Sequence, residues 1–166
     1  MIVFESARTI VRHLTKNDLE DFFRLNGDAE IMRYIRKPRT REECETQIKE
    51  TIETYKQTPG IGRFAVIEKS TGNYLGSFAL IPLANTDDFH LGYALLKESQ
   101  GKGYATEITK AAIPFVFKTI DKELIKAITI PANTASQNVL LKAGFIETGR
   151  MIHEGDEVMV FELKRN

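Results

Sequence analysis

The sequence has very little cysteine, no excess of charge of either sign and no long apolar run. Cys44 is the single cysteine among 166 residues, which excludes an internal disulfide framework and a cysteine-rich zinc site and fits a reducing, cytoplasmic environment. Lysine plus arginine and aspartate plus glutamate both number 23, so we expect no nucleic-acid binding through bulk positive charge. No apolar stretch approaches the roughly 18 residues that span a bilayer, and the opening residues show no secretory signal. We therefore expect a cytoplasmic protein with neither nucleic acid nor membrane as a partner.

What remains is the composition of an ordinary globular domain. Hydrophobic residues make up 42% of the chain and charged residues 28%. At roughly 100–200 residues per domain, the length predicts a single domain over residues 1–166 that buries a core of its own. His13, His90 and His153 are too few and too scattered to propose a metal centre.

Apolar periodicity, helix caps and turn residues predict a mixed succession of strands and helices. Strands are expected at 9–14, 63–68, 74–81, 89–96, 124–130, 145–152 and 157–163, and helices at 15–25, 29–35, 40–57, 104–117 (with a kink at Pro114) and 134–143. The order is β-α-α-α-β-β-β-α-β-α-β-β. Because a three-strand meander precedes the crossover helix, a simple doubly wound Rossmann fold is excluded, and the expected fold class is mixed α/β, or α+β.

A glycine-rich turn is the most informative segment. The run Gln-Gly-Lys-Gly-Tyr-Ala-Thr covers Gln100 to Thr106 and lies between an expected strand and an expected helix. Glycines allow a ligand to approach the main chain, and the free amides at a helix start attract an anion, for which a pyrophosphate is the natural choice. The run is not a Walker loop, and Thr106 stands where a dinucleotide fingerprint requires a third glycine. A plain glycine turn into a helix remains the alternative.

Three blocks in order resemble the GNAT family of N-acetyltransferases. Gln100-x-x-Gly103-x-Ala105 is similar to that family's Gln/Arg-x-x-Gly-x-Gly/Ala motif. A second block runs from Asn133-Thr-Ala-Ser to Gly144-Phe145, with the family's spacing of eleven positions between Asn and Gly. The third is Thr9-Ile-Val-Arg together with Ile31-Met-Arg-Tyr. The resemblance covers nearly the whole chain and is greatest to the RimJ/RimL-like branch, which acetylates the N-termini of ribosomal proteins.

The resemblance implies a GNAT fold, a central, mostly antiparallel twisted sheet in which strands 89–96 and 124–130 splay into a V-shaped cleft. It also implies acetyl-CoA as co-substrate, with no metal. The pantetheine arm is then expected along Tyr93, Ala94 and Leu95. The pyrophosphate is expected on the loop and helix start formed by Gln100, Gly101, Lys102, Gly103, Tyr104, Ala105 and Thr106.

Two asparagines complete the cofactor residues that the resemblance implies. Asn133 corresponds to an asparagine that bonds the cofactor arm in family members, and Asn138 is expected to face the same cleft. Each has a second interpretation, since asparagine favours helix N-caps and Asn138 is also suited to a solvent-facing helix position. Lys102 is expected either to add charge to the phosphate site or to remain solvated.

The expected acid and base side chains of the family are replaced in this chain. Leu140 stands where many relatives carry a tyrosine that protonates the thiolate, and Ile128 stands where some carry a glutamate base. The RimJ/RimL-like branch often has a glutamate just before Leu/Ile-Gly-Tyr, and His90 occupies that place. An imidazole with a pKa of about 6.5 accepts a proton at neutral pH, so His90 is the candidate base, with an exposed strand histidine as the alternative. Asp87 and Asp88 are fallback bases.

Acetyl transfer from a thioester needs a neutral amine and a donor for the developing oxyanion. The resemblance assigns that donor to a backbone amide near Leu95. An α-amine with a pKa of about 7.7–8.0 already has a useful neutral fraction, about a quarter, near pH 7.4, whereas a lysine amine near 10.4 is neutral only about one part in a thousand. We therefore expect direct transfer to a primary amine, foremost a protein or peptide N-terminus. The alternatives are a polyamine or aminoglycoside acetyltransferase and a non-catalytic acyl-CoA-binding module, and a homodimer is one of the oligomeric states left open.

Several other residues have both a functional and a structural interpretation. Phe22, Phe23 and Tyr34 are expected either to form a wall of the acceptor pocket, which involves the early helices in this family, or to pack in the core. Glu107 and Cys44 favour structural roles, as a charge at a helix start and an inert thiol.

Overall fold

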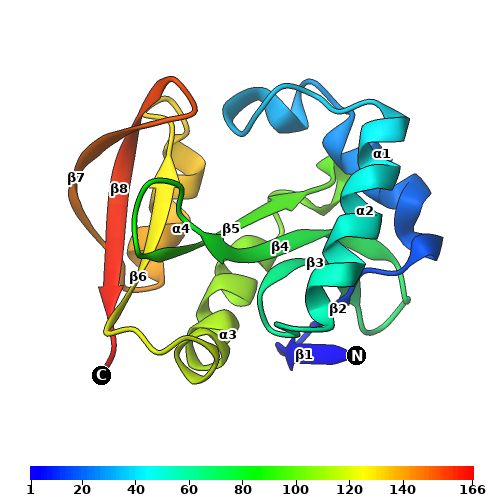
Figure 1. The fold of residues 1–166 in the computed structure, drawn as a ribbon, viewed down its shortest axis with the longest axis horizontal. Coiled ribbons are helices and arrows are strands. Elements are labelled where there is room, and N and C mark those ends of the chain that lie inside the picture. Colours follow the sequence, from blue (N-terminus) through cyan, green and yellow to red (C-terminus); the bar gives the residue numbers. More distant parts are fainter.

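The computed structural model describes residues 1–166 and contains one eight-stranded sheet flanked by helices (Figure 1). The strands are β1 (Ile2–Glu5), β2 (Thr9–His13), β3 (Gly62–Glu68), β4 (Tyr74–Pro82), β5 (Phe89–Leu95), β6 (Leu124–Thr129), β7 (Ile146–His153) and β8 (Asp156–Lys164). The α-helices are α1 (Leu19–Asn26), α2 (Arg41–Tyr55), α3 (Tyr104–Thr119) and α4 (Thr134–Lys142), and short 3-10 segments lie at η1 (Lys16–Asp18), η2 (Ile31–Tyr34) and η3 (Lys97–Ser99). None of the helices is both long and apolar enough to cross a membrane.

The sheet is antiparallel except at one junction. Its strand order is β1-β2-β3-β4-β5-β6-β8-β7, and β5 and β6 are the parallel neighbours. These two strands are in register only at His90 and Lys126, near the beginning of each, and they separate toward their C-terminal ends. The mixed fold class and the divergence of these two strands are therefore confirmed.

The helices cover both faces of the sheet because side chains alternate along each strand. Ala65 of β3 packs with Phe22 and Leu25 of α1 and with Ile48 of α2. Its neighbour Phe64 points to the opposite face, into a second cluster that includes the inner side of α3. Alternate residues of β5 therefore face opposite sides of the sheet: one set faces α1 and α2, and the other set faces α3 and α4.

The structure differs from the expected elements in three places. Strand β1 was not predicted, because it is a four-residue edge strand in which only Phe4 is buried. Residues 29–35 form a short 3-10 segment rather than a helix, and α3 continues through the exposed Pro114 to Thr119. Elsewhere the predicted strands and helices are present, with ends shifted by a few residues.

Gly76 allows β4 and β5 to approach closely at the C-terminal end of β5, beyond the point where β5 leaves its parallel neighbour. A Cβ atom at this position would lie 2.1 Å from the carbonyl oxygen of Ala94 and 2.8 Å from the Cα of Leu95. Both neighbours are backbone atoms of the opposite strand, so a side chain here would push the end of β5 out of place. The position of this end of β5 therefore depends on a glycine at 76.

We predict that Gly76→Ala lowers the free energy of unfolding by about 1–3 kcal/mol, because the strands must separate to admit the methyl group. Urea denaturation measures this change. Gly92→Ala is the matched control on β5, since no atom lies within 4 Å of an added Cβ there, and its effect should stay within about 0.5 kcal/mol. Equal stability of the two variants would contradict the close approach.

Candidate active site

The loop between η3 and α3 presents a row of free backbone amides. Gly101 and Gly103 both have left-handed backbone conformations, with φ of 72° and 82°, and Gly103 is the N-cap of α3. The first backbone bond of the helix runs from the amide of Glu107 to the carbonyl oxygen of Gly103, at 3.1 Å. The amides from Gly101 to Thr106 have no acceptor within the protein. This arrangement suits an anion, as the glycine-rich sequence indicated.

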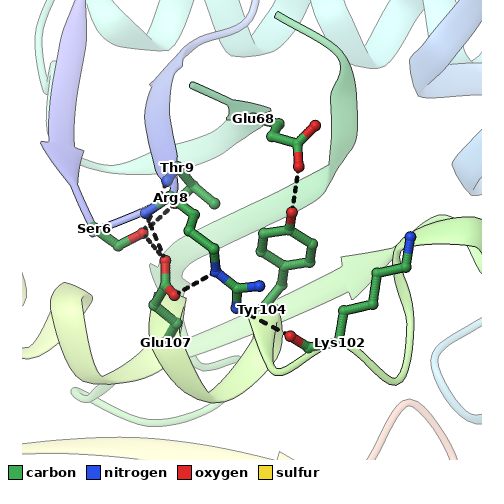
Figure 2. A network of polar contacts seen from close by, with 7 residues as sticks. All are labelled: Ser6, Arg8, Thr9, Glu68, Lys102, Tyr104 and Glu107. Atoms are coloured by element: carbon green, nitrogen blue, oxygen red, sulfur yellow. Dashed lines mark hydrogen bonds and ion pairs between the residues drawn. The ribbon is translucent and has the colours of Figure 1, made fainter. Parts of the chain in front are cut away.

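The loop is held in place by the turn between β1 and β2 (Figure 2). Arg8 donates from Nη2 to the carbonyl oxygen of Lys102 at 3.0 Å, and its Nε lies 2.9 Å from a carboxylate oxygen of Glu107. The same guanidinium lies 4.1 Å from the centre of the Tyr104 ring, whose hydroxyl donates to Glu68 at 2.5 Å. The backbone carbonyl of Lys102 therefore points to Arg8, while the side chain of Lys102 remains exposed.

Glu107 connects helix α3 to this turn and does not face the free amides. Ser6 donates to its carboxylate at 2.5 Å, and the backbone amide of Arg8 donates at 3.0 Å. Partial burial opposes the charge of Glu107, but these hydrogen bonds outweigh it and lower the pKa of the carboxyl group. The structural role expected for Glu107 is thus confirmed, with Arg8 as a partner that the sequence did not reveal.

Strand β5 has a backbone edge that no neighbouring strand occupies. The amide of Leu96 donates to Leu75 of β4 at 2.9 Å, and in an antiparallel ladder successive residues bond to opposite sides. Tyr93 and Leu95 therefore direct their amides away from β4, toward the side on which β6 has separated. Ala94 pairs with Ser77 of β4, so its backbone groups belong to the sheet, and the expected contact with a pantetheine arm is wrong for this residue.

Gln100 links this free edge to the amide-rich loop. Its side-chain amide donates to the carbonyl oxygen of Leu95 at 3.0 Å. The bond occupies that carbonyl and leaves the amide of Leu95 free. Gln100 was expected to contact the cofactor itself, whereas the structure uses it to position the loop and the strand relative to each other.

The start of helix α4 lies beside Tyr93. Asn133 is the N-cap of this helix and accepts from the amide of Ser136 at 3.3 Å, which leaves its side-chain NH₂ group free. The hydroxyl groups of Tyr93 and Ser136 are 3.4 Å apart. Ser136 was missed as a site residue, although it stands three positions after Asn133 in the family-like block. Asn138 is exposed and lies two positions beyond Ser136 on the helix, which favours the solvent-facing interpretation over a place in the cleft.

His90 is half-buried next to His153, with 6.0 Å between the ring centres. Burial is the main cause that lowers its pKa to about 4, and the charges of His153 and Arg63 lower it further. The imidazole is therefore neutral throughout the physiological range. The titration near neutrality expected for an unperturbed histidine is not supported.

The other candidate acids and bases are accounted for structurally. Asp88 forms an ion pair with Lys126 at 2.9 Å, whereas Asp87 is exposed in the loop. Leu140 is 2% exposed and belongs to the core, and Ile128 is a half-buried residue of β6. Neither apolar side chain can move a proton. The site therefore has neither a phenol at position 140 nor a carboxylate at position 128.

The expected aromatic wall is divided between core and surface. Phe22 is 1% exposed and belongs to the core. Phe23 lines a hollow of about 340 Å³ between α1 and the segment that follows β5. Tyr34 is half-buried beneath the guanidinium of Arg33, which lies 5.0 Å from its ring centre.

Comparisons with known proteins agree with this geometry. The model of the acetyltransferase (GNAT) domain matches residues 8–146. YoaA of Bacillus subtilis (strain 168), described as an uncharacterized N-acetyltransferase, is 26% identical over 150 residues, which are 89% of this chain and 84% of YoaA. The crystal structure of a GNAT-family acetyltransferase from Bacillus anthracis has a TM-score of 0.84 at 22% identity and covers 99% of this chain and 98% of its own.

Solved structures with different acceptors resemble the chain about equally. RimL, a ribosomal L7/L12 alpha-N-protein acetyltransferase in complex with coenzyme A, has a TM-score of 0.80 at 16% identity, covering 99% of this chain and 98% of RimL. Spermidine N-acetyltransferase from Vibrio cholerae, in complex with CoA and spermine, has a TM-score of 0.78 at 21% identity, covering 95% of this chain and 96% of that enzyme. These structures confirm the GNAT fold and do not single out the RimJ/RimL-like branch.

The family model and the geometry describe the same parts of the molecule. The matched region begins at Arg8, which holds the loop, and includes β5, the free amides and α4. The chain belongs to the GNAT family of acetyltransferases, and it is an N-acetyltransferase.

Proposed function

We propose that residues 1–166 form one domain that transfers an acetyl group from acetyl-CoA directly to a primary amine, the N-terminal α-amine of a peptide. The observation that carries the proposal is the continuity between the free edge of β5 and the free amides that begin α3. An elongated ligand with amide groups in its arm and a pyrophosphate at its end matches both features, and acetyl-CoA is such a ligand.

In this proposal the backbone provides most of the contacts to acetyl-CoA. The pyrophosphate binds to the amides from Gly101 to Thr106, the pantetheine arm pairs with the free backbone groups of Tyr93, and the free amide of Leu95 donates to the thioester oxygen. The free side-chain NH₂ of Asn133 donates to the arm, while Lys102 adds a solvated positive charge near the phosphates. The position of Gly101 supports this arrangement, since no atom of the protein lies within 4 Å of an added Cβ there.

The reaction needs positioning more than side-chain chemistry. The lone pair of the acceptor amine attacks the thioester carbonyl, the amide of Leu95 donates to the resulting oxyanion, and collapse of the intermediate breaks the C–S bond. Holding the two reactants together can supply roughly 7–11 kcal/mol of the barrier. A fixed backbone donor in a site that excludes water adds to this.

His90 is proposed to accept the amine proton, directly or through water. Its low pKa makes the imidazole a weak base, so the help it gives is modest. An α-amine suits such a site because a useful fraction of it is already neutral at pH 7.4, whereas neutralising a lysine amine costs roughly 4 kcal/mol. The same reasoning favours a peptide N-terminus over a lysine side chain.

The leaving thiolate takes its proton from a hydroxyl group beside α4. Leu140 offers none, but the hydroxyls of Tyr93 and Ser136 face each other on that side of β5. Burial raises the pKa of Tyr93 above its ordinary value, so the phenol is protonated at neutral pH and can donate to the thiolate as it forms, although the same shift makes it a weak acid and its help modest. The pair thus supplies the acid that the sequence alone did not reveal.

We predict that the purified protein releases free thiol from acetyl-CoA when a lysine-free peptide with an unblocked N-terminus is added. A thiol-reactive dye follows the release, and mass spectrometry locates the acetyl group on the α-amine. The N-blocked peptide with one lysine, spermidine and an aminoglycoside serve as comparison acceptors and should react at least tenfold more slowly. Transfer to the polyamine or aminoglycoside alone would contradict the proposed acceptor, and no release with any amine would indicate an acyl-CoA-binding module.

We predict that Gly101→Ala weakens CoA binding at least tenfold, or about 1.4 kcal/mol. Alanine is strained at a φ of 72°, and its methyl group enters the open space assigned to the phosphates. Calorimetry measures the affinity. Gly72→Ala is the matched control, because Gly72 has a φ of 76° and equally open surroundings but lies in the β3–β4 turn. An unchanged affinity of folded Gly101→Ala would remove the pyrophosphate from this loop.

We predict that His90→Ala lowers kcat/KM for the peptide about ten- to a hundredfold, below the upper range of general-base effects. Because the pKa of His90 is about 4, the imidazole stays neutral from pH 6 to 8. Over this range the rate should rise with pH as the amine loses its proton, in wild type and variant alike, at saturating acetyl-CoA. Asp87→Asn should keep full activity. A change of slope near pH 6.5 in the pH–rate profile of the wild type, absent from the variant, would contradict the low pKa of His90.

A further inference from the structure

Three arginines on the acceptor side of the sheet lack an acidic partner. Arg36, Arg39 and Arg63 are each half-buried, yet none of them forms an ion pair. The arginine ion pairs of the chain are made by Arg8, Arg12, Arg24, Arg41, Arg150 and Arg165. The Nε of Arg39 is buried and has no hydrogen-bond partner at all. Buried unpaired donors of this kind are rare and call for an explanation.

The three side chains come from elements that meet at one end of the sheet. Arg63 is at the start of β3, where its partner Ala79 on β4 is in turn paired with Gly92 of β5. Side-chain alternation therefore places Arg63 on the same face as His90, two strand spacings across the sheet and two residues along β5, or about 12 Å away. Arg36 and Arg39 lie in the segment between η2 and α2, which covers this face (Figure 1).

Asn26 fixes the segment that carries two of these arginines. This residue is 4% exposed, and its side-chain oxygen accepts from Nη1 of Arg36 at 3.1 Å. Its backbone carbonyl accepts from the amide of Arg39 at 2.8 Å. The arginines are therefore held in place near each other by the end of α1, and they are not free to extend into solvent.

The three positive charges act on each other, and one of them, Arg63, also acts on His90. Burial and the charge of Arg39 lower the pKa of Arg36, while burial and the charges of Arg36 and Arg39 lower the pKa of Arg63 to about 10. Arg63 also contributes to the low pKa of His90. Glu154, in the turn between β7 and β8, is the carboxylate that acts on Arg36 and Arg63, but its side chain is 69% exposed and outside ion-pair distance.

We propose that Arg36, Arg39 and Arg63 bind a carboxylate of the acceptor, so that the enzyme selects peptides with Asp or Glu at the second or third position. The proposal rests on the proposed function, because it places the acceptor amine beside His90. An extended peptide advances about 3.3 Å per residue, so an acidic side chain one or two residues after the amine reaches the arginines. Guanidinium groups pair with carboxylates in a planar, two-point geometry, which suits a site that must choose between peptides.

The same charges disfavour polycations as acceptors. A polyamine or aminoglycoside would place several ammonium groups against three guanidinium groups that already repel one another. The solved structures related to this chain include a spermidine acetyltransferase, so the fold alone does not exclude such substrates. Here the exclusion comes from the charged residues that this chain places around the acceptor amine.

Three peptides of equal length test the inference with wild-type enzyme. They begin Ser-Glu-Glu, Ser-Gln-Gln and Ser-Lys-Lys and are otherwise identical, and free glutamate serves as a fourth acceptor. We expect kcat/KM for the Glu peptide to exceed that for the Gln peptide at least tenfold, mainly through KM, with the Lys peptide slowest. Preference for free glutamate over the Glu peptide would assign the site to a small amino acid and overturn the peptide as its source.

Substitution of the arginines then identifies the residues responsible. Arg39→Gln and Arg63→Gln should reduce the Glu/Gln preference to below threefold, and this ratio within each variant is the readout, because Arg63 also lowers the pKa of His90 and its loss can change the rate with every peptide. Arg33→Gln is the matched control, since Arg33 lies in η2 just before this segment, is exposed and also lacks an ion pair; it should keep the full preference. The melting temperatures of Arg39→Gln and Arg63→Gln should equal or exceed that of the wild type, because each of these two substitutions removes a positive charge that the other arginines repel.

A binding measurement separates failure of this inference from failure of the proposed function. Fluorescence anisotropy of C-terminally labelled peptides, with CoA present, should show tighter binding of the Glu peptide that Arg39→Gln and Arg63→Gln abolish. If the wild-type enzyme acetylates all peptides equally, the carboxylate site is wrong while the acetyltransferase proposal stands. If no peptide is acetylated but the Glu peptide binds in the arginine-dependent way, the carboxylate site stands and the acetyltransferase proposal is wrong. A preference that survives both substitutions overturns the inference.

Discussion

The separation of β5 from β6 after a single paired position is the constraint on which the rest of the structure depends. A strand inside a sheet uses all its backbone donors and acceptors, and β5 instead keeps one edge free beyond His90. The amides of Tyr93 and Leu95 are then available to a ligand and to a developing oxyanion. Gly76 fixes where this edge ends, because only hydrogen fits between its Cα and the backbone of Ala94.

The free amides at the start of α3 extend the same surface, and they depend on residues far along the chain. Two left-handed glycines turn the backbone, but the position of the loop is set by Arg8, which binds the carbonyl of Lys102 from 94 residues away (Figure 2). Gln100 ties the other end of the loop to Leu95. The strand edge and the loop are therefore held as one preorganised binding surface, which reduces the ordering that a long, flexible ligand would otherwise require.

Charge divides the two sides of the sheet. Near α3 and α4 the site is built from amides and hydroxyls, whereas the side of α1 and α2 carries the half-buried Arg36, Arg39 and Arg63 together with a neutral histidine. The charge of Arg63, which helps to lower the basicity of His90, is one of those proposed to bind the acceptor. Once a carboxylate is bound there, it offsets those charges and raises the pKa of His90, so the base becomes stronger when the right peptide is present.

The sequence by itself determined most elements, the mixed sheet, the glycine loop and the strand that precedes it, because caps, turns and apolar periodicity act over a few residues. It also placed Leu140 and Ile128 where no proton can be moved. Only the tertiary structure decided that Ala94 bonds to β4, that Asn138 faces solvent and that Ser136 meets Tyr93. The pairing of Arg8 with the loop, the three unpaired arginines and the low pKa of His90 likewise depend on burial and on contacts between distant segments, which no local pattern encodes.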